Sequence, residues 1–335
     1  MARAKKTYAF KEVYPGIFTC PLPMPDKKLG PVNVYLFPGP CTTLLDTGNV
    51  WGTKPLSQAL AGLGFRFDDL DQIVLSHGHF DHYGAAYHIT RLASKPIRVA
   101  AHREDRRVIE TGREVPDAVI LEFVTLMGVP YFYRYMLKVT SKVLQRMGSN
   151  CPVNQVLEDG DTLSLGHYQG RVISTPGHTR GSISIHLPGE NILFSGDHLL
   201  EHISPNALVM LDPEQPLPRR LSQEEFFASV HKIEELQPRV VFPGHGLPIH
   251  DLAAVGQKYR NSFLRRQKRI LGTVAGEELT VFDIVRKIFP RLNRLYLFLD
   301  IYLAVSEVYS HLQVLEKEQK IIKRLHRDRL LFRAV

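Results

Sequence analysis

Three histidines and one aspartate stand within six positions, at His77, His79, Asp81 and His82, directly after the apolar run 73–75. An apolar run this short predicts a buried strand. Side chains repeat every two residues along an extended backbone, so His77 and His79 share a face, and the chain must then turn to bring Asp81 and His82 to a neighbouring point. A polar turn that caps a helix would need only one histidine. The density of imidazole and carboxylate groups, without sulfur, therefore predicts a zinc, iron or manganese site and argues against a zinc finger.

Three further ligand-type residues repeat one local design. His178, Asp197 and His245 each stand three to five residues beyond the end of a short apolar run, and each has a glycine directly before it. Glycine permits tight turns and close approach of the backbone. Strand ends on one edge of a sheet converge in space, where α/β proteins place their sites. Each motif alone is ordinarily just a turn, but together with the first cluster they predict one shared site.

This pattern resembles the metallo-β-lactamase superfamily over roughly residues 10–250. The matching signature is His77-x-His79-x-Asp81-His82, followed by His178, Asp197 and His245. The resemblance implies a four-layer αβ/βα sandwich, an α/β fold that also agrees with the alternation of predicted strands and helices. It implies two divalent metal ions, first of all zinc, with iron or manganese as alternatives.

The resemblance also implies a role for each ligand. His77, His79 and His178 hold one metal ion, Asp81, His82 and His245 hold the second, and Asp197 bridges them. Asp46, in Leu-Leu-Asp-Thr-Gly, matches a position that orients a ligand histidine, which metal-bound imidazoles usually require.

Two metal ions a few ångströms apart bring the pKa of a shared water close to neutrality. The ligand set therefore predicts hydrolysis by a metal-bridging hydroxide, with Asp81 as the group that accepts or shuttles the proton. Charge at the metals stabilises the oxyanion, so no serine triad is needed.

The presence of both Asp81 and Asp197 separates this chain from the antibiotic-hydrolysing branch of the superfamily. The pattern is more similar to the glyoxalase-II-like and lactonase-like branches, which predicts a thioester or ester substrate, with a lactone as the alternative. A nucleic-acid phosphodiesterase and an iron-dependent persulfide dioxygenase remain less favoured hypotheses. The partner that we expect is a small-molecule acyl substrate.

Composition sets the remaining limits. The 335 residues are 44% hydrophobic, and no apolar run reaches the length of a membrane span. Cys20, Cys41 and Cys151 are odd in number and widely spaced, which favours a reducing compartment and hence the cytoplasm. The net charge of +8 is concentrated in residues 253–335, which hold 17 Lys and Arg against 8 Asp and Glu. Such a balance is typical either of a surface for an anionic partner or of solvated helix faces.

We predict a catalytic domain over residues 1–256 with a helical insertion at 103–150, and a small, mostly helical region at 257–335. The insertion contains Tyr131 and Tyr135, which are either part of a packed helical pair or of a lid that contacts substrate. His198 and His202, just beyond Asp197, are low-ranked substrate contacts, because their spacing of four fits a helix surface equally well.

The C-terminal region is predicted to contain helices at 258–271, 281–288 and 295–315, followed by a hairpin formed by 321–325 and 329–332. Helices followed by two strands resemble the winged-helix-like tail of some superfamily members. This resemblance keeps nucleic-acid binding open. The apolar face of 295–315 is either internal core or the contact of a homodimer.

Overall fold

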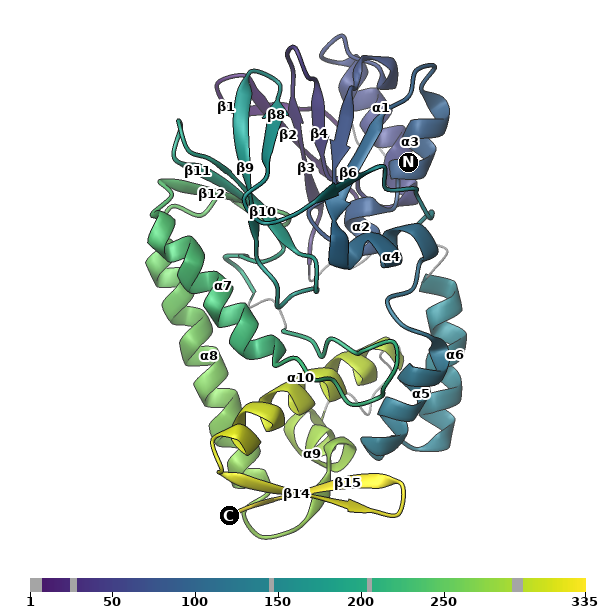
Figure 1. Ribbon diagram of the computed structural model, residues 1–335, viewed down its shortest axis with the longest axis vertical. Coiled ribbons are helices and arrows are strands. Elements are labelled where there is room, and N and C mark those ends of the chain that lie inside the picture. The colour runs from purple at the N-terminus through teal and green to yellow at the C-terminus, as the bar shows by residue number, and fades with distance from the viewer. Residues whose placement is uncertain (1–7, 25–28, 145–147, 204–206, 291–297) are drawn as a thin grey trace, which may run out of the picture.

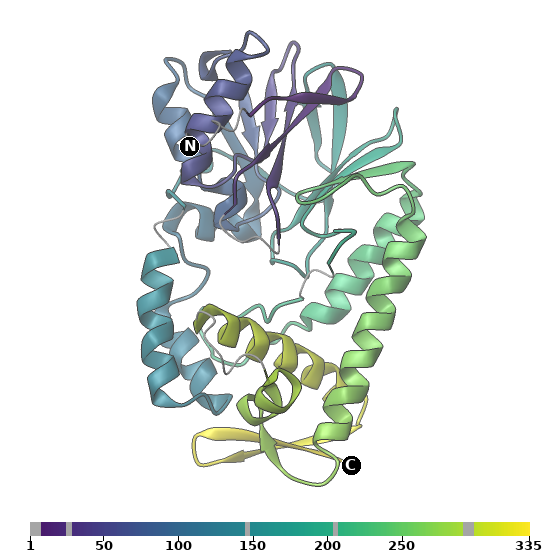
Figure 2. The ribbon, with the colours of Figure 1, turned by 180° about the vertical axis from the view of Figure 1, so that it is seen from behind.

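Two β-sheets pack face to face and helices cover both outer faces, so the predicted four-layer α/β sandwich is confirmed (Figure 1). This computed structural model describes residues 8–24, 29–144, 148–203, 207–290 and 298–335. A second body, made of helices and a small three-stranded sheet, lies below the sandwich in Figure 1 and is seen from behind in Figure 2.

The first sheet has seven strands in sequence order. The first four pair as an antiparallel meander and the last four run parallel, so β4 belongs to both patterns. The turn at Pro38-Gly39-Pro40 joins β3 and β4 as an antiparallel hairpin. The strands are β1 (Lys11–Tyr14), β2 (Ile17–Leu22), β3 (Val32–Phe37), β4 (Thr43–Leu45), β5 (Gln72–Val74), β6 (Arg98–His102) and β7 (Gln155–Leu157).

The second sheet has five strands in the order β12-β11-β10-β9-β8. Its strands pair antiparallel except for β11 and β12, which are parallel because α7 (Ser222–Leu236) connects them as a crossover. The strands are β8 (Thr162–Leu165), β9 (Tyr168–Ser174), β10 (Ile183–Leu187), β11 (Ile192–Gly196) and β12 (Val240–Pro243).

Three apolar clusters hold these layers together. Between the sheets, Phe37 and Phe194 pack with their ring centroids 5.1 Å apart. A second cluster lies between the first sheet and the helices α1 (Thr53–Ala61) and α3 (Ala86–Leu92), and a third lies between the second sheet and α7. Most strands therefore bury side chains on both of their faces, which explains why their sequences are largely apolar.

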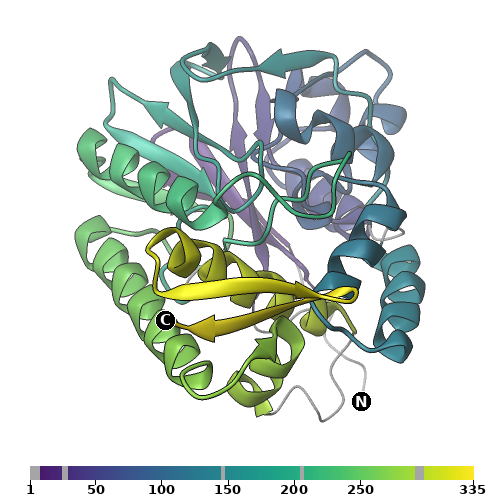
Figure 3. The ribbon, with the colours of Figure 1, turned by 60° about the horizontal axis from the view of Figure 1, so that its bottom comes forward.

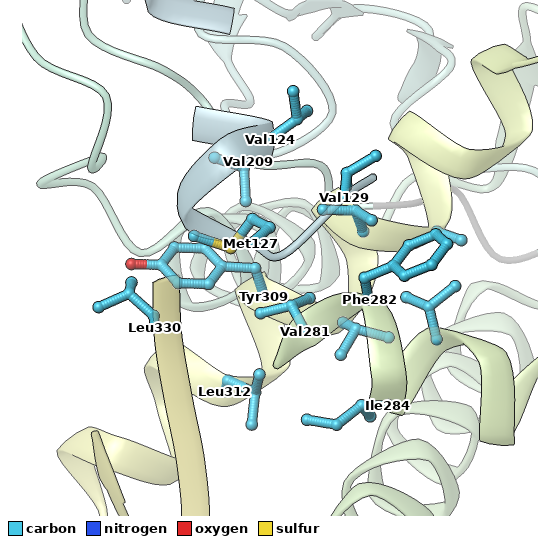
Figure 4. Close-up of a cluster of buried hydrophobic side chains, with 14 of the residues drawn as sticks. Val124, Met127, Val129, Val209, Val281, Phe282, Ile284, Tyr309, Leu312 and Leu330 are labelled. Carbon is cyan, nitrogen blue, oxygen red and sulfur yellow. The ribbon is translucent and has the colours of Figure 1, made fainter. Parts of the chain in front are cut away.

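The helices of the predicted insertion, residues 103–150, pack in two different bodies. Its first helix, α4 (Arg103–Thr111), buries Ile109 in the cluster under the first sheet. The next two, α5 (Asp117–Leu126) and α6 (Tyr131–Leu144), pack instead with the C-terminal region. Val124 and Met127, for example, share a buried cluster with residues between 270 and 332 (Figure 4). We call this second body the helical unit.

The rest of the helical unit comes from the C-terminal region. Its elements are β13 (Leu279–Thr280), α9 (Val281–Ile288), α10 (Phe298–Lys317), β14 (Ile321–His326) and β15 (Arg329–Ala334). The predicted terminal hairpin is confirmed, and β13 joins it to give the order β13-β15-β14 (Figure 3). The start of the helix predicted from 295 falls partly on 291–297, which lie outside the described residues.

The long helix α8 (Leu252–Thr273) belongs to both bodies. Val255 and Tyr259 pack under the second sheet, whereas Ile270 packs in the helical unit. The helix begins earlier than predicted because Asp251 caps it, with its carboxylate accepting the Ala254 N–H at 2.9 Å. The domain boundary that we predicted at 256/257 therefore falls inside one continuous helix, and the insertion does not belong to the sandwich alone.

The apolar face of α10 is covered within the chain. Val305, Val308 and Leu312 are fully buried in the core of the helical unit, so this face is internal core rather than a dimer contact. Among the described helices, none combines the length and the apolar character that crossing a bilayer requires. The three cysteines form no disulfide.

Candidate metal centre

The strand ends of both sheets meet at one edge of the sandwich, where they are joined by backbone hydrogen bonds. The Ile183 N–H donates to the Ser76 carbonyl at 2.9 Å, and the Asn33 N–H donates to the Gly244 carbonyl at 2.7 Å. Gly244 allows a close approach, because a Cβ atom there would stand 2.3 Å from Asp197 Oδ1. The glycine beside the ligand therefore serves the close packing that its motif predicts.

One group of ligand-type atoms comes from three histidines. His79 Nδ1 lies 3.0 Å from His77 Nε2 and 3.0 Å from His178 Nε2. His77 and His79 come from the turn after β5, and His178 comes from the turn after β9. The three ring nitrogens thus converge on one point, as the three-histidine set requires.

Asp81, His82 and His245 form a second group whose ligand atoms all lie within 4.8 Å of one another. Asp197 lies between the two groups. One of its carboxylate oxygens, Oδ1, is 3.3 Å from His82 Nε2, and the other, Oδ2, is 3.5 Å from His245 Nε2 and 3.8 Å from His178 Nε2. The structure therefore brings together all seven of the ligand residues predicted from the sequence.

Three of the ligand histidines have a partner that fixes the ring. Asp46 Oδ2 lies 2.8 Å from His82 Nδ1 and accepts the Ser76 hydroxyl at 2.7 Å. The same hydroxyl lies 3.0 Å from His77 Nδ1, and the Pro31 carbonyl lies 3.0 Å from His245 Nδ1. In each ring Nδ1 is engaged, which leaves Nε2 directed at the ligand cluster. Asp46, predicted to orient a ligand histidine, contacts the His82 ring directly and the His77 ring only through the Ser76 hydroxyl.

The ligand histidines differ in the direction of their pKa shifts. Burial lowers the pKa of His77 well below 6.5, and burial lowers the pKa of His178 to about 3. Burial acts the same way on His82, but the carboxylates of Asp197, Asp46 and Asp81 outweigh it and raise its pKa well above 6.5. The pKa of His245 is raised as well, because Asp197 and Asp81 outweigh its burial.

The donor set fits divalent metal ions. His82 Nε2, His245 Nε2 and Asp197 Oδ1 are buried without any hydrogen-bond partner among the described residues. Buried polar atoms are rarely left unpaired, because each costs desolvation energy. Imidazole nitrogen and carboxylate oxygen directed at a common point are the ligands that zinc, iron and manganese accept.

Comparison with known proteins agrees with this geometry. The family model of the metallo-beta-lactamase superfamily matches residues 28–245. The chain belongs to this superfamily.

Two proteins resemble the chain over most of its length. A probable metallo-hydrolase, YqjP of Bacillus subtilis (strain 168), is 26% identical over 299 residues, which cover 88% of this chain and 90% of the relative. The crystal structure of a metallo-beta-lactamase family protein from Thermus thermophilus is 26% identical with a TM-score of 0.81, and the match covers 97% of this chain and 100% of that one. The second match includes the helical unit as well as the sandwich.

A third relative carries the name of a reaction. The atrochrysone carboxyl ACP thioesterase of Aspergillus fumigatus is 24% identical over 259 residues, covering 75% of this chain and 63% of the relative.

The four proposed substrate contacts differ in position. His198 is fully buried, with its ring centroid 4.7 Å from that of Phe226, so its side chain is not exposed to a substrate that approaches from solvent. His202 is exposed and lies beside Gly246, where a Cβ atom would meet its Nδ1 at 2.8 Å. Tyr131 and Tyr135 are exposed on α6 in the helical unit. Substrate contact by His202, Tyr131 and Tyr135 remains a prediction.

One residue at this edge, Asp105, was not predicted from the sequence. Asp105, in α4, is buried and accepts hydrogen bonds from both of the turns that carry the three-histidine group. It stands in Arg-Glu-Asp-Arg-Arg, a run that is typical of a solvated helix face, so its local sequence held no signal of this role.

Proposed function

We propose that the protein is a binuclear metal-dependent hydrolase that cleaves thioester or ester bonds. The observation that carries the proposal is the position of Asp197, whose carboxylate lies within 3.8 Å of ligand nitrogens from both groups. A carboxylate placed in this way suits a bridge between two cations. Superfamily membership and the metallo-hydrolase name of the Bacillus relative support the hydrolase class.

The two ions have separate ligand sets in this proposal. His77, His79 and His178 would hold one ion, and Asp81, His82 and His245 would hold the other, with Asp197 shared. Zinc is the first choice, and iron or manganese would accept the same donors. Two bound divalent ions would supply the positive charge that acidifies a water and polarises a carbonyl.

Asp81 is the residue that we assign to proton transfer. Burial raises its pKa, but His82 and His245 outweigh this effect and keep the pKa below 3.8. The carboxylate is therefore ionised and can accept a proton. Its Oδ2 lies 3.4 Å from His245 Nε2, inside the cluster rather than on the surface. This position suits a group that takes a proton from a water held among the ligands and returns it to the leaving group.

The thioester class is favoured over its alternatives by the name of the Aspergillus relative, an ACP thioesterase. A lactone is the second candidate, because its hydrolysis needs the same attack on a carbonyl. Both substrates would approach the cluster from the side of His79 and His178, the two ligand residues that are partly accessible to solvent.

Nucleic-acid cleavage is less favoured. The order α8-β13-α9-α10-β14-β15 supports our proposal of a winged-helix-like region. In helix-turn-helix proteins the second helix of the motif enters the major groove, but here the corresponding α10 is largely buried in the helical unit. Many of the basic side chains are also paired with carboxylates: Arg266–Glu307, Lys317–Glu224, Lys323–Glu316 and Arg324–Glu278.

The test is a substrate screen on the full chain loaded with zinc. An acyl-coenzyme A, an acyl-glutathione, a γ-lactone and a single-stranded RNA are assayed side by side, with His79→Ala as the inactive control. We expect hydrolysis of a thioester that is lost in the variant. Cleavage of RNA alone would overturn the proposal, and so would a preparation that holds one iron and consumes oxygen with a persulfide.

A further inference from the structure

The ligand histidines are not all held in the same way. His77, His82 and His245 each have a partner on Nδ1, as described above. His79 directs its Nδ1 at the ligand cluster, and His178 Nδ1 is buried without a hydrogen-bond partner among the described residues. The positions of the His79 and His178 rings therefore depend on the backbone that carries them. Among the described residues, neither ring has a hydrogen-bond partner on the nitrogen that faces away from the cluster.

Asp105 holds that backbone on both sides. Its Oδ2 accepts the Gly78 N–H at 2.7 Å and the Thr179 hydroxyl at 2.6 Å, and its Oδ1 accepts the Gly181 N–H at 2.8 Å. Gly78 stands between His77 and His79, and Thr179 directly follows His178. One buried carboxylate thus joins the turn after β5 to the turn after β9.

The packing around the Asp105 carboxylate leaves no room for a side chain at either of the two glycines that donate to it. A Cβ atom on Gly78 would stand 2.2 Å from Val108 Cγ1 and 3.3 Å from the Asp105 carboxyl carbon. A Cβ atom on Gly181 would stand 2.5 Å from the Asp105 backbone nitrogen. Both glycines are therefore required for α4 to approach the two turns closely enough for a short side chain to reach them.

We propose that Asp105 is a positioning residue for the three-histidine group, which sets the affinity of that group for its metal ion without touching the ion. The inference rests on the metal centre proposed above and is independent of the substrate. It assigns the two buried carboxylates separate tasks. Asp46 contacts the His82 ring of the second group directly and the His77 ring of the first group only through Ser76, whereas Asp105 fixes the turns of the first group.

The first experiment compares Asp105→Asn with two matched variants in zinc titrations of the full metal-free chain. Asparagine keeps the shape of the side chain but presents an NH₂ group to at least one N–H donor. We expect the affinity for one of the two ions to fall by about 10- to 100-fold, the usual effect of losing an outer partner of a metal ligand, and the other affinity to stay unchanged. Asp46→Asn should weaken the second ion more than the first, because Asp46 contacts His82 directly and His77 only through Ser76.

Asp71→Asn is the structural control. Asp71 also accepts a backbone N–H, from Thr42 at 2.8 Å, but it contacts no ligand turn. Equal metal affinities in Asp105→Asn and Asp71→Asn would overturn the inference, and so would an equal loss of both ions in Asp105→Asn. Failure of the wild-type chain to bind two ions would instead contradict the proposed function, so the two failures are distinguishable.

A second variant and a second measurement keep the inference testable if Asp105→Asn does not fold. Thr179→Val removes one donor to Asp105 and preserves side-chain shape. We expect a smaller loss of affinity for the same ion, together with faster amide hydrogen exchange in peptides that cover 76–79 and 177–182 of the metal-free protein. Unchanged affinity and unchanged exchange in Thr179→Val would overturn the inference.

Discussion

The strand-end edge of the sandwich and the interior of the helical unit bury different chemistry. At the edge, ionisable side chains lie together with several atoms unpaired, among them His82, Asp197 and His245. In the helical unit, aliphatic and aromatic side chains such as Phe123 and Val308 fill the interior, and the two regions meet along α8 (Figure 1). The edge gathers side chains suited to a metal ion, whereas apolar side chains predominate in the interior of the unit. Perturbations of packing and of charge should therefore act on different regions.

Removal of residues 257–335 should have the largest effect. The cut falls within α8 and takes away the partners of Phe123 and Met127, so that α5 and α6 would expose their apolar faces. We expect an insoluble or non-cooperatively unfolding product, measured by soluble yield and by circular dichroism on heating. A soluble fragment that melts cooperatively like the full chain would show that the sandwich is independent of the helical unit.

Two matched truncations compare the regions directly. Phe123→Ala empties a fully buried site in the helical unit, and Phe194→Ala empties one between the sheets. Each should lower the free energy of unfolding by about 3–5 kcal/mol, measured by urea denaturation. Only Phe194→Ala should also reduce bound zinc, because Phe194 lies in β11 three residues before Asp197. Equal loss of zinc in both variants would contradict the separation of the two regions.

Metal binding should release protons in a way that depends on pH. In the metal-free protein the raised pKa of His82 means that its ring is protonated near pH 7, and the ion must displace that proton. We expect release of about one proton or more per chain at pH 7, and less release as the pH rises through the raised pKa. Calorimetry in buffers of different ionisation enthalpy measures this number.

The same shift has a consequence for the stability of the metal-free chain. A histidine whose folded pKa lies above its unfolded value stabilises the fold below the unfolded pKa and loses that contribution as the pH rises through the folded one. The contribution of His82 to the free energy of unfolding should therefore decline on the alkaline side of pH 6.5. His82→Gln should flatten this dependence in metal-free urea titrations.

The smallest effect is expected at the surface of the helical unit. Lys317→Ala removes an exposed ion pair with Glu224, 2.7 Å long, which links α10 to α7. Pairs of this kind contribute about 0–1 kcal/mol, and salt screens them. We expect unchanged zinc content and a change in the free energy of unfolding below about 1 kcal/mol. A larger loss would mean that charge, and not packing alone, holds the unit to the sandwich.

The ligand residues were predictable because they stand at strand exits, and five of the seven have a glycine directly beside them. Strand, turn and ligand are neighbours in sequence at His77, Asp197 and His245, so local pattern alone indicates the site. The terminal hairpin followed from similar local signals. Asp105 gave no such signal, because its partners, Gly78 and Gly181, are distant in sequence and only the packed fold brings them together.

The packing of α5 and α6 in the helical unit could not be predicted for a related reason. Periodicity shows that α5 and α6 each have an apolar face, but it does not show which surface covers that face. Packing against residues 270–332, more than a hundred positions later, is a non-local contact without any local signature. The first turns of α8 were not predicted because Leu252–Gln257 lacks a clear apolar periodicity. Asp251 caps the helix, but in the sequence it cannot be distinguished from an aspartate in a turn.

The division of the helical unit between two distant stretches has a consequence for synthesis. Residues 115–137 leave the ribosome well before residues 270–332, which supply most of their buried neighbours. During that interval α5 and α6 have exposed apolar faces, a condition in which nascent chains associate wrongly or need chaperones. The sandwich closes only when β12 has emerged, at residues 240–243, and the helical unit closes later still, with β15. Strand β15 thus completes the helical unit, whose helix α5 is synthesised about two hundred residues earlier.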